Sequence, residues 1–211
     1  QNQYFPFYKV KEMVEFYKKT YPTFSTKKFN DYNLIFKLDE NKRVRQLSKG
    51  MQMRLSLMLN LSITPDVLIL DEPTSGLDAI AKRQMLDILL QEVAENQLTI
   101  FVSSHHLGEL ERICDEIAMI HQGEITYVST LDEMKQNIKK LQVIFEDHSP
   151  VDFATWDEVR SVERVGRVYY IITQKYSKEL EDKLYKAGAK FVEQMNLSLE
   201  EIFVYTSEEG Q

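Results

Sequence analysis

The stretch Val67-Leu68-Ile69-Leu70-Asp71-Glu72-Pro73 decides how the rest of the chain is interpreted. Its four consecutive apolar residues are typical of a strand that is buried on both faces of a parallel sheet. Asp71 and Glu72 follow at the end of this strand, where ligands bind in open α/β sheets. One acid can organise a hydrated Mg²⁺ there while its neighbour activates an attacking water. Taken alone, the pair is explained equally well by acids that cap a strand end.

Two short segments on either side of this strand precede helices. Leu47-Ser48-Lys49-Gly50-Met51 offers Ser48 as a helix cap and Gly50 as a position where a backbone amide can approach a ligand closely. A helix start of this kind suits phosphate, although an ordinary N-cap explains the segment too. Ser75-Gly76-Leu77-Asp78 follows the acids, and a tight turn with a capping aspartate accounts for it without any function.

A second apolar run, Leu98 to Val102, ends in Ser103-Ser104-His105-His106. This places imidazole groups at the end of another expected central strand. A lone histidine in such a place is usually a bystander. A functional role for these histidines is therefore indicated only in combination with the motifs that precede them.

The remaining pattern alternates helices with strands, which predicts an α/β fold with a mostly parallel sheet. Beyond residue 140 the order of the expected helices and strands indicates a small α+β domain. Helices are expected over 9–21, 25–36, 48–62, 79–94, 107–114, 177–187 and from 198, with a further helix start at 129–132. In the first helix Val10, Met13, Val14 and Tyr17 recur at helical spacing, and Ser25 is a suitable N-cap of the second. Strands are expected over 67–70, 98–102, 117–120, 141–145, 165–173 and near 191, with a further strand after the turn at Gln122-Gly123.

The order of the four segments strongly resembles that of the nucleotide-binding subunit of an ATP-binding cassette (ABC) transporter, over about residues 1–135. The resemblance implies a partial P-loop NTPase (ABC ATPase) fold with a helical subdomain, followed by the small C-terminal α+β domain. We expect the nucleotide-binding domain to cover 1–138, with the helical subdomain at about 1–62 and the core at 63–138. The accessory domain is expected at 139–211.

The resemblance also implies roles for individual residues, with ATP and Mg²⁺ as ligands. In the family, the signature segment of one subunit contacts ATP held mainly by the opposite subunit, and the D-loop crosses the dimer interface. By position, the signature is Ser48, Lys49, Gly50 and Met51 and the D-loop ends at Asp78, and the resemblance implies that these five residues contact ATP. It also implies that Asp71 assists Mg²⁺, that Glu72 is the general base, and that His105, with His106 as the alternative, senses the γ-phosphate.

The sequence also departs from the family pattern. Lys49 and Met51 replace a glycine and a glutamine of the common signature. A basic cluster is expected from Lys42, Arg43, Arg45, Lys49 and Arg54, although a solvated charged face explains these residues equally well. The Walker A loop, G-x-x-x-x-G-K-[ST], does not occur in the 211 residues. Because the chain starts at Gln1, we expect the first part of the fold to lie outside it, and ATP binding by the chain alone to be weak.

Composition excludes several classes of protein. With 43% hydrophobic and 28% charged residues the chain is a folded protein, and its net charge of −7 argues against general binding to nucleic acid. No apolar run approaches the ~20 residues of a membrane-spanning helix, so a cytosolic chain is expected. The single cysteine, Cys114, is expected to be a small buried hydrophobe.

The resemblance implies partners as well: integral membrane permease subunits and a second nucleotide-binding subunit, identical or not, on the inner face of the cell membrane. Tyr4, Phe5, Phe7 and Tyr8 occupy the segment where the family docks against its membrane subunits, unless they only staple the next helix. Leu199 to Phe203 resembles the ending of the bacitracin-resistance and multidrug-export branch. Two alternatives stay open: a soluble ABC-type ATPase of DNA repair or translation, and a non-catalytic fragment that contributes its signature helix in trans.

Overall fold

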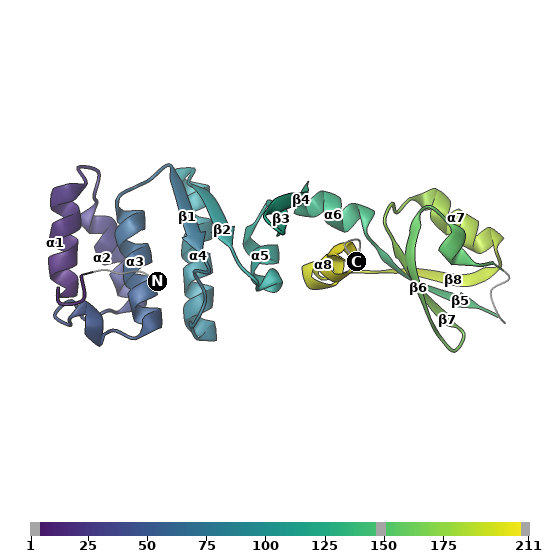
Figure 1. The fold of residues 1–211 in the computed structure, drawn as a ribbon, viewed down its shortest axis with the longest axis horizontal. Helices are drawn as coiled ribbons and strands as arrows, with labels where there is room; N and C mark the ends of the chain where they lie inside the picture. Colours follow the sequence, from purple (N-terminus) through teal and green to yellow (C-terminus); the bar gives the residue numbers. More distant parts are fainter. Residues whose placement is uncertain (1–4, 147–150, 208–211) are drawn as a thin grey trace. The chain divides into compact units, whose positions relative to one another are not determined.

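A computed structural model describes residues 5–146 and 151–207 (Figure 1). Their packing divides the chain into two compact units, Gln1–His105 and His106–Gln211, which are described separately. The expected boundary between a nucleotide-binding domain and an accessory domain at residue 138 stays a prediction. Within the described ranges, no helix combines the length and the apolarity needed to cross a membrane.

The first unit begins with three helices around one apolar core. The spacing prediction for the first of them is confirmed, because Val10, Met13, Val14 and Tyr17 are its buried residues. Ser25 caps the second helix by accepting a hydrogen bond from the Lys28 amide, also as predicted. The elements are α1 (Val10–Thr20), α2 (Thr26–Phe36), the 3₁₀ turn η1 (Val44–Gln46) and α3 (Lys49–Ser62).

The same unit contains two parallel strands joined by a long helix. β1 (Val67–Asp71) pairs with β2 (Thr99–Ser103), and α4 (Ala79–Asn96) connects them. The expectation that β1 is buried on both faces is wrong. Leu68 is buried, whereas Ile69 and its partner Phe101 are 78% and 64% exposed. Side chains alternate along a strand, and within the described residues only one face of this pair is covered by the core.

The second unit starts with a hairpin flanked by two short helices. β3 (Glu116–His121) pairs antiparallel with β4 (Glu124–Thr130), and the turn between them places Gln122 and Gly123 at positive φ. α5 (Leu107–Ile113) precedes the hairpin and α6 (Leu131–Asn137) follows it. The predicted mostly parallel sheet is therefore wrong for this hairpin, and among the described strands β1 and β2 are the parallel pair.

A four-stranded antiparallel sheet of order β6-β7-β5-β8 completes this unit. Leu180 and Leu184 of its helix pack on the buried face of the sheet with Leu141 and Val143. The predicted strand 165–173 is confirmed over 168–173, but its start is wrong, because Gly166 at φ +63° turns the chain between Val165, the end of one strand, and the next. The elements are β5 (Lys140–Phe145), η2 (Phe153–Thr155), β6 (Val159–Val165), β7 (Val168–Thr173), α7 (Lys178–Lys186), β8 (Ala189–Met195) and α8 (Leu199–Ser207).

Candidate functional site

The candidate site lies where β1 and β2 end. Parallel pairing brings Asp71 opposite Ser103. The Ser103 hydroxyl donates to Asp71 Oδ1 at 2.6 Å, and the Glu72 amide donates to the Ser103 carbonyl at 3.1 Å. The role of Ser103 in orienting the Asp71 carboxylate was not predicted from the sequence. The signal that could have found it is that both residues end strands of equal length in the same sheet.

Glu72 and His105 meet directly beyond these strand ends. The His105 amide donates to Glu72 Oε1 at 3.0 Å, and His105 Nδ1 lies 2.7 Å from the same oxygen. Glu72 Oε2 is buried and has no hydrogen-bond partner within the described residues, while the Glu72 side chain as a whole is 34% exposed. The carboxylate is thus fixed through one oxygen and leaves the other available to accept a proton.

The backbone of Glu72 is unusual. Its φ of 47° lies in the left-handed region, which residues with a side chain seldom adopt. The turn that follows is held by a hydrogen bond from the Ser75 amide to the Glu72 carbonyl at 3.1 Å. Such conformations persist only where the surrounding structure enforces them, and they cluster at functional sites.

Asp71 is the residue expected to assist Mg²⁺. Its carboxylate is exposed, and one of its oxygens accepts from Ser103. No group of three or more His, Cys, Asp or Glu side chains within the described ranges forms a metal cage. A single carboxylate nevertheless suits Mg²⁺, which is commonly held by one or two carboxylates together with substrate phosphates and water.

The start of α3 and the Ser75–Asp78 turn lie against each other. Ser48 is exposed and caps α3, with Oγ accepting from the Met51 amide at 3.2 Å. Gly50 is buried, and a Cβ built there would come within 2.9 Å of Leu77 Cδ2 and 3.4 Å of the Gly76 carbonyl oxygen. A close approach inside the chain therefore explains this glycine, in addition to the expected approach of a ligand.

Asp78 ends this turn and caps α4. Its Oδ1 accepts from the Ala81 amide at 2.9 Å, and its Oδ2 lies 3.3 Å from Arg54 Nη2. The hydrogen bond from Ala81, with a smaller contribution from the Arg54 charge, lowers the pKa of the Asp78 carboxyl. The carboxylate that the resemblance assigns to the nucleotide is thus already used twice within its own chain.

The expected basic cluster is not a single feature in the structure. Arg54 pairs with Asp78, Arg43 donates from Nη1 to the Phe7 carbonyl at 2.7 Å, and the Arg45 guanidinium lies over the Phe7 ring. Lys49 is exposed beside Gly76. Of these residues, only Lys49 lies in the signature segment itself. His106 occupies the N-cap position of α5, whereas it is His105 that contacts Glu72.

Comparison with known proteins identifies the family. A family model described as "ABC transporter" matches residues 1–75. The ABC transporter ATP-binding protein YtrB of Bacillus subtilis is 30% identical over 205 residues, which cover 97% of this chain and 70% of YtrB. The chain belongs to the ATP-binding proteins of ABC transporters. The bacitracin transport ATP-binding protein BcrA of Bacillus licheniformis is 37% identical over 102 residues, 48% of this chain and 33% of BcrA.

Solved structures agree on the ABC fold. One titled "Structure of ATP binding subunit of ABC transporter" has a TM-score of 0.56 and 24% identity, and the match covers 63% of this chain and 57% of that one. A dimeric bacterial ABC transporter cassette has a TM-score of 0.54 and 22% identity, over 61% and 59% of the two chains. The predicted fold class, an ABC ATPase fold of the P-loop NTPase kind, is confirmed.

Proposed function

We propose that this ABC protein is the ATP-hydrolysing subunit of a transporter, with Glu72 as the base that activates water. The observation that carries the proposal is the Glu72 carboxylate. One of its oxygens is held by two nitrogens of His105, and both residues follow the ends of parallel strands. The other oxygen is buried and meets no hydrogen-bond partner in the part of the chain that the structure describes. An oriented carboxylate of this kind is suited to general base catalysis.

The neighbouring residues divide the remaining tasks. His105 holds Glu72 in place, and its exposed ring can exchange that contact for one with a γ-phosphate. Asp71, oriented by Ser103, would hold Mg²⁺. When bound, the cation would neutralise charge on the phosphates of ATP.

The signature segment would serve a second subunit. Ser48 and Lys49 are exposed at the N-terminal end of α3, where free amides and the helix dipole favour an anion. We therefore expect a dimer, of identical or different subunits, in which this tip faces ATP held by the partner. Loss of the γ-phosphate would remove that contact and reopen the dimer.

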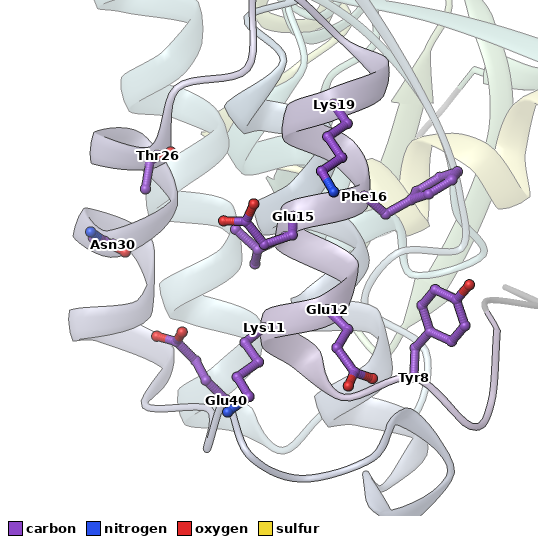
Figure 2. Close-up of a pocket in the computed structure, with 10 residues that line it drawn as sticks. Tyr8, Lys11, Glu12, Glu15, Phe16, Lys19, Thr26, Asn30 and Glu40 are labelled. Carbon is purple, nitrogen blue, oxygen red and sulfur yellow. The ribbon is translucent and has the colours of Figure 1, made fainter.

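The surface beside α1 is where we expect the membrane subunits to dock. A cleft of about 620 Å³ lies between α1, α2 and the segment before α1, and Figure 2 shows Tyr8, Lys11, Glu15 and Phe16 around it. Phe5 stacks on Tyr8 at 5.0 Å between ring centroids and meets the Phe16 ring edge-on, so an exposed aromatic cluster borders the cleft. Tyr4, which was expected to join it, lies outside the described residues.

We propose export as the direction of transport, because Leu199 to Phe203 resembles the ending of the bacitracin-resistance and multidrug-export branch. BcrA, a relative of this chain, is named as a bacitracin transport protein. Work with integral membrane permease subunits would place the chain at the inner face of the cell membrane.

Replacement of Glu72 tests the proposal. In the full-length subunit, Glu72→Gln should preserve ATP binding and lower turnover by about a hundredfold or more, because a general base contributes at least that factor. Glu95→Gln changes an exposed glutamate on α4 in the same way and should leave turnover unchanged. Phosphate release and nucleotide titration measure the two quantities. Undiminished hydrolysis by Glu72→Gln would remove Glu72 from this role.

The 211-residue chain alone is a separate test. It contains no Walker A sequence, so we propose that upstream residues of a longer protein supply that loop. Isothermal titration of the 211 residues with Mg-ATP should then show little binding. Micromolar affinity would contradict this part of the proposal.

A further inference from the structure

Arg54 lies in a position that neither phosphate attraction nor simple solvation explains. It extends from α3 to the start of α4, where its Nη2 lies 3.3 Å from Asp78 Oδ2. Its side chain is only 19% exposed, and its guanidinium carbon lies 5.8 Å from the centroid of the Phe36 ring of α2. Its Nε is buried and has no hydrogen-bond partner among the described residues. The guanidinium is therefore anchored on an aromatic face and directed at one carboxylate.

Arg54 joins two segments that already touch at two other points. Gly50 leaves no room between α3 and Leu77, and the Lys49 side chain lies beside Gly76. The Arg54–Asp78 ion pair is a third contact between α3 and this turn, at the end of the turn. The start of α3 and the Ser75–Asp78 turn thus form one packed unit.

This unit leads directly to the carboxylate of the site. The Ser75 amide donates to the Glu72 carbonyl at 3.1 Å, and the Leu77 amide donates to the Thr74 carbonyl at the same distance. A displacement of the turn is therefore transmitted to Glu72 through the backbone. It also changes where Ser48, at the tip of α3, lies relative to Glu72.

We propose that Arg54 is a positioning residue for ATP hydrolysis, which holds the Ser75–Asp78 turn on α3 through Asp78 and so fixes Glu72 relative to Ser48. The consequence for turnover rests on the proposed ATPase function. Half-exposed ion pairs contribute little to stability, so this pair is better suited to fixing geometry than to holding the unit folded. The lowered pKa of Asp78 agrees with a carboxylate that is ionised in this contact.

The test uses the full-length subunit and separates kcat from KM. Arg54→Met should lower kcat about tenfold, because small misplacements of catalytic groups are costly, and change KM for ATP less than about threefold. Arg54→Lys should recover most of the loss, since only one nitrogen of Arg54 contacts Asp78. Arg83→Gln removes an exposed arginine from α4 and should leave kcat unchanged.

A double-mutant cycle distinguishes positioning through Asp78 from a general packing role. Asp78→Asn retains a good helix cap but removes the charge. In that background Arg54→Met should cause no further loss of kcat. If the two losses multiply, or if folded Arg54→Met has the kcat of the wild type, the inference is overturned.

Hydrogen exchange gives a readout that does not depend on turnover. In nucleotide-free Arg54→Met and Arg54→Lys, the Ser75 and Leu77 amides should exchange faster in the first variant than in the second. Equal, wild-type exchange in both variants would overturn the inference even if the subunit hydrolysed no ATP. Absence of hydrolysis by the wild-type subunit would instead contradict the proposed function.

Discussion

Gly50 illustrates how a single residue serves two neighbours in the candidate site. It is the second residue of α3, which Ser48 caps, and its Cα faces the buried side chain of Leu77 in the turn after Glu72. An added methyl group would displace Leu77 Cδ2, which lies at the end of a flexible side chain but inside the core. The consequence of filling this space can be measured separately from ligand binding.

Gly50→Ala should lower the free energy of unfolding by up to about 2 kcal/mol, since overpacking costs about 1–3 kcal/mol and the better helix propensity of alanine returns about 1 kcal/mol. Urea denaturation followed by far-UV circular dichroism measures the change. In a Leu77→Ala background the space is free, and the same substitution should become stabilising by about 1 kcal/mol. The same destabilisation in both backgrounds would show that the contact with Leu77 is not the cause.

At the scale of elements, one carboxylate connects three helices of the second unit. Glu111 on α5 accepts from Lys135 Nζ of α6 at 2.8 Å and from the Leu199 amide, at the start of α8, at 3.2 Å. The hydrogen bond with Lys135 is the main reason that the pKa of Glu111 is lowered, and the bond from Leu199 adds to it. The C-terminal helix is thereby attached to α5.

A carboxyl group whose pKa is lowered by folding stabilises the native state above its unfolded pKa, and this stabilisation disappears as the pH falls through the folded pKa. Glu111→Gln should therefore lower the thermal midpoint at pH 7 by about 2–4 °C, the shift for about 1 kcal/mol in a chain of this size. The difference from the wild type should close in acid, where both side chains are neutral. Glu116→Gln, an exposed change on β3, is the control. A gap that persists in acid would contradict the explanation.

A buried carboxylate joins α2 to α4 in the first unit. Glu92 accepts from the Tyr32 hydroxyl at 2.6 Å, from Lys28 Nζ at 2.8 Å and from Asn96 Nδ2 at 3.1 Å. Burial and this carboxylate together raise the pKa of Tyr32. Helical periodicity predicted the helix that carries Tyr32 but not which charge its hydroxyl meets, because the partner lies 60 residues away in the sequence.

For the whole molecule, the expected consequence of the aromatic cluster is attachment to membrane subunits. Phe16→Ser should reduce co-purification of the full-length subunit with its permease by about fivefold or more, since truncating an anchoring aromatic residue costs more than about 1 kcal/mol. Leu34 on α2 is 75% exposed and does not line the cleft, so Leu34→Ser is the matched control. Equal recovery of both variants would place the permease contact elsewhere.

Features that depend on a few neighbouring residues could be predicted from the sequence. Strand ends and helix caps follow from local patterns, and both are present in the structure. The direct contact of Glu72 with His105 was not predicted, although both residues were singled out at strand ends. Contacts between segments were not predictable in this way. The pairing of Arg54 with Asp78 and the exposure of Ile69 depend on which surfaces meet in three dimensions, and neither composition nor periodicity encodes that.

The left-handed backbone at Glu72 has a consequence for engineering. Glycine adopts this conformation at no steric cost, so replacing the proposed base by glycine relieves an unfavourable geometry while it removes the chemistry. A selection for thermal stability alone would thus favour glycine at position 72, in variants that no longer hydrolyse ATP. Any directed-evolution campaign on this scaffold therefore has to score turnover alongside robustness.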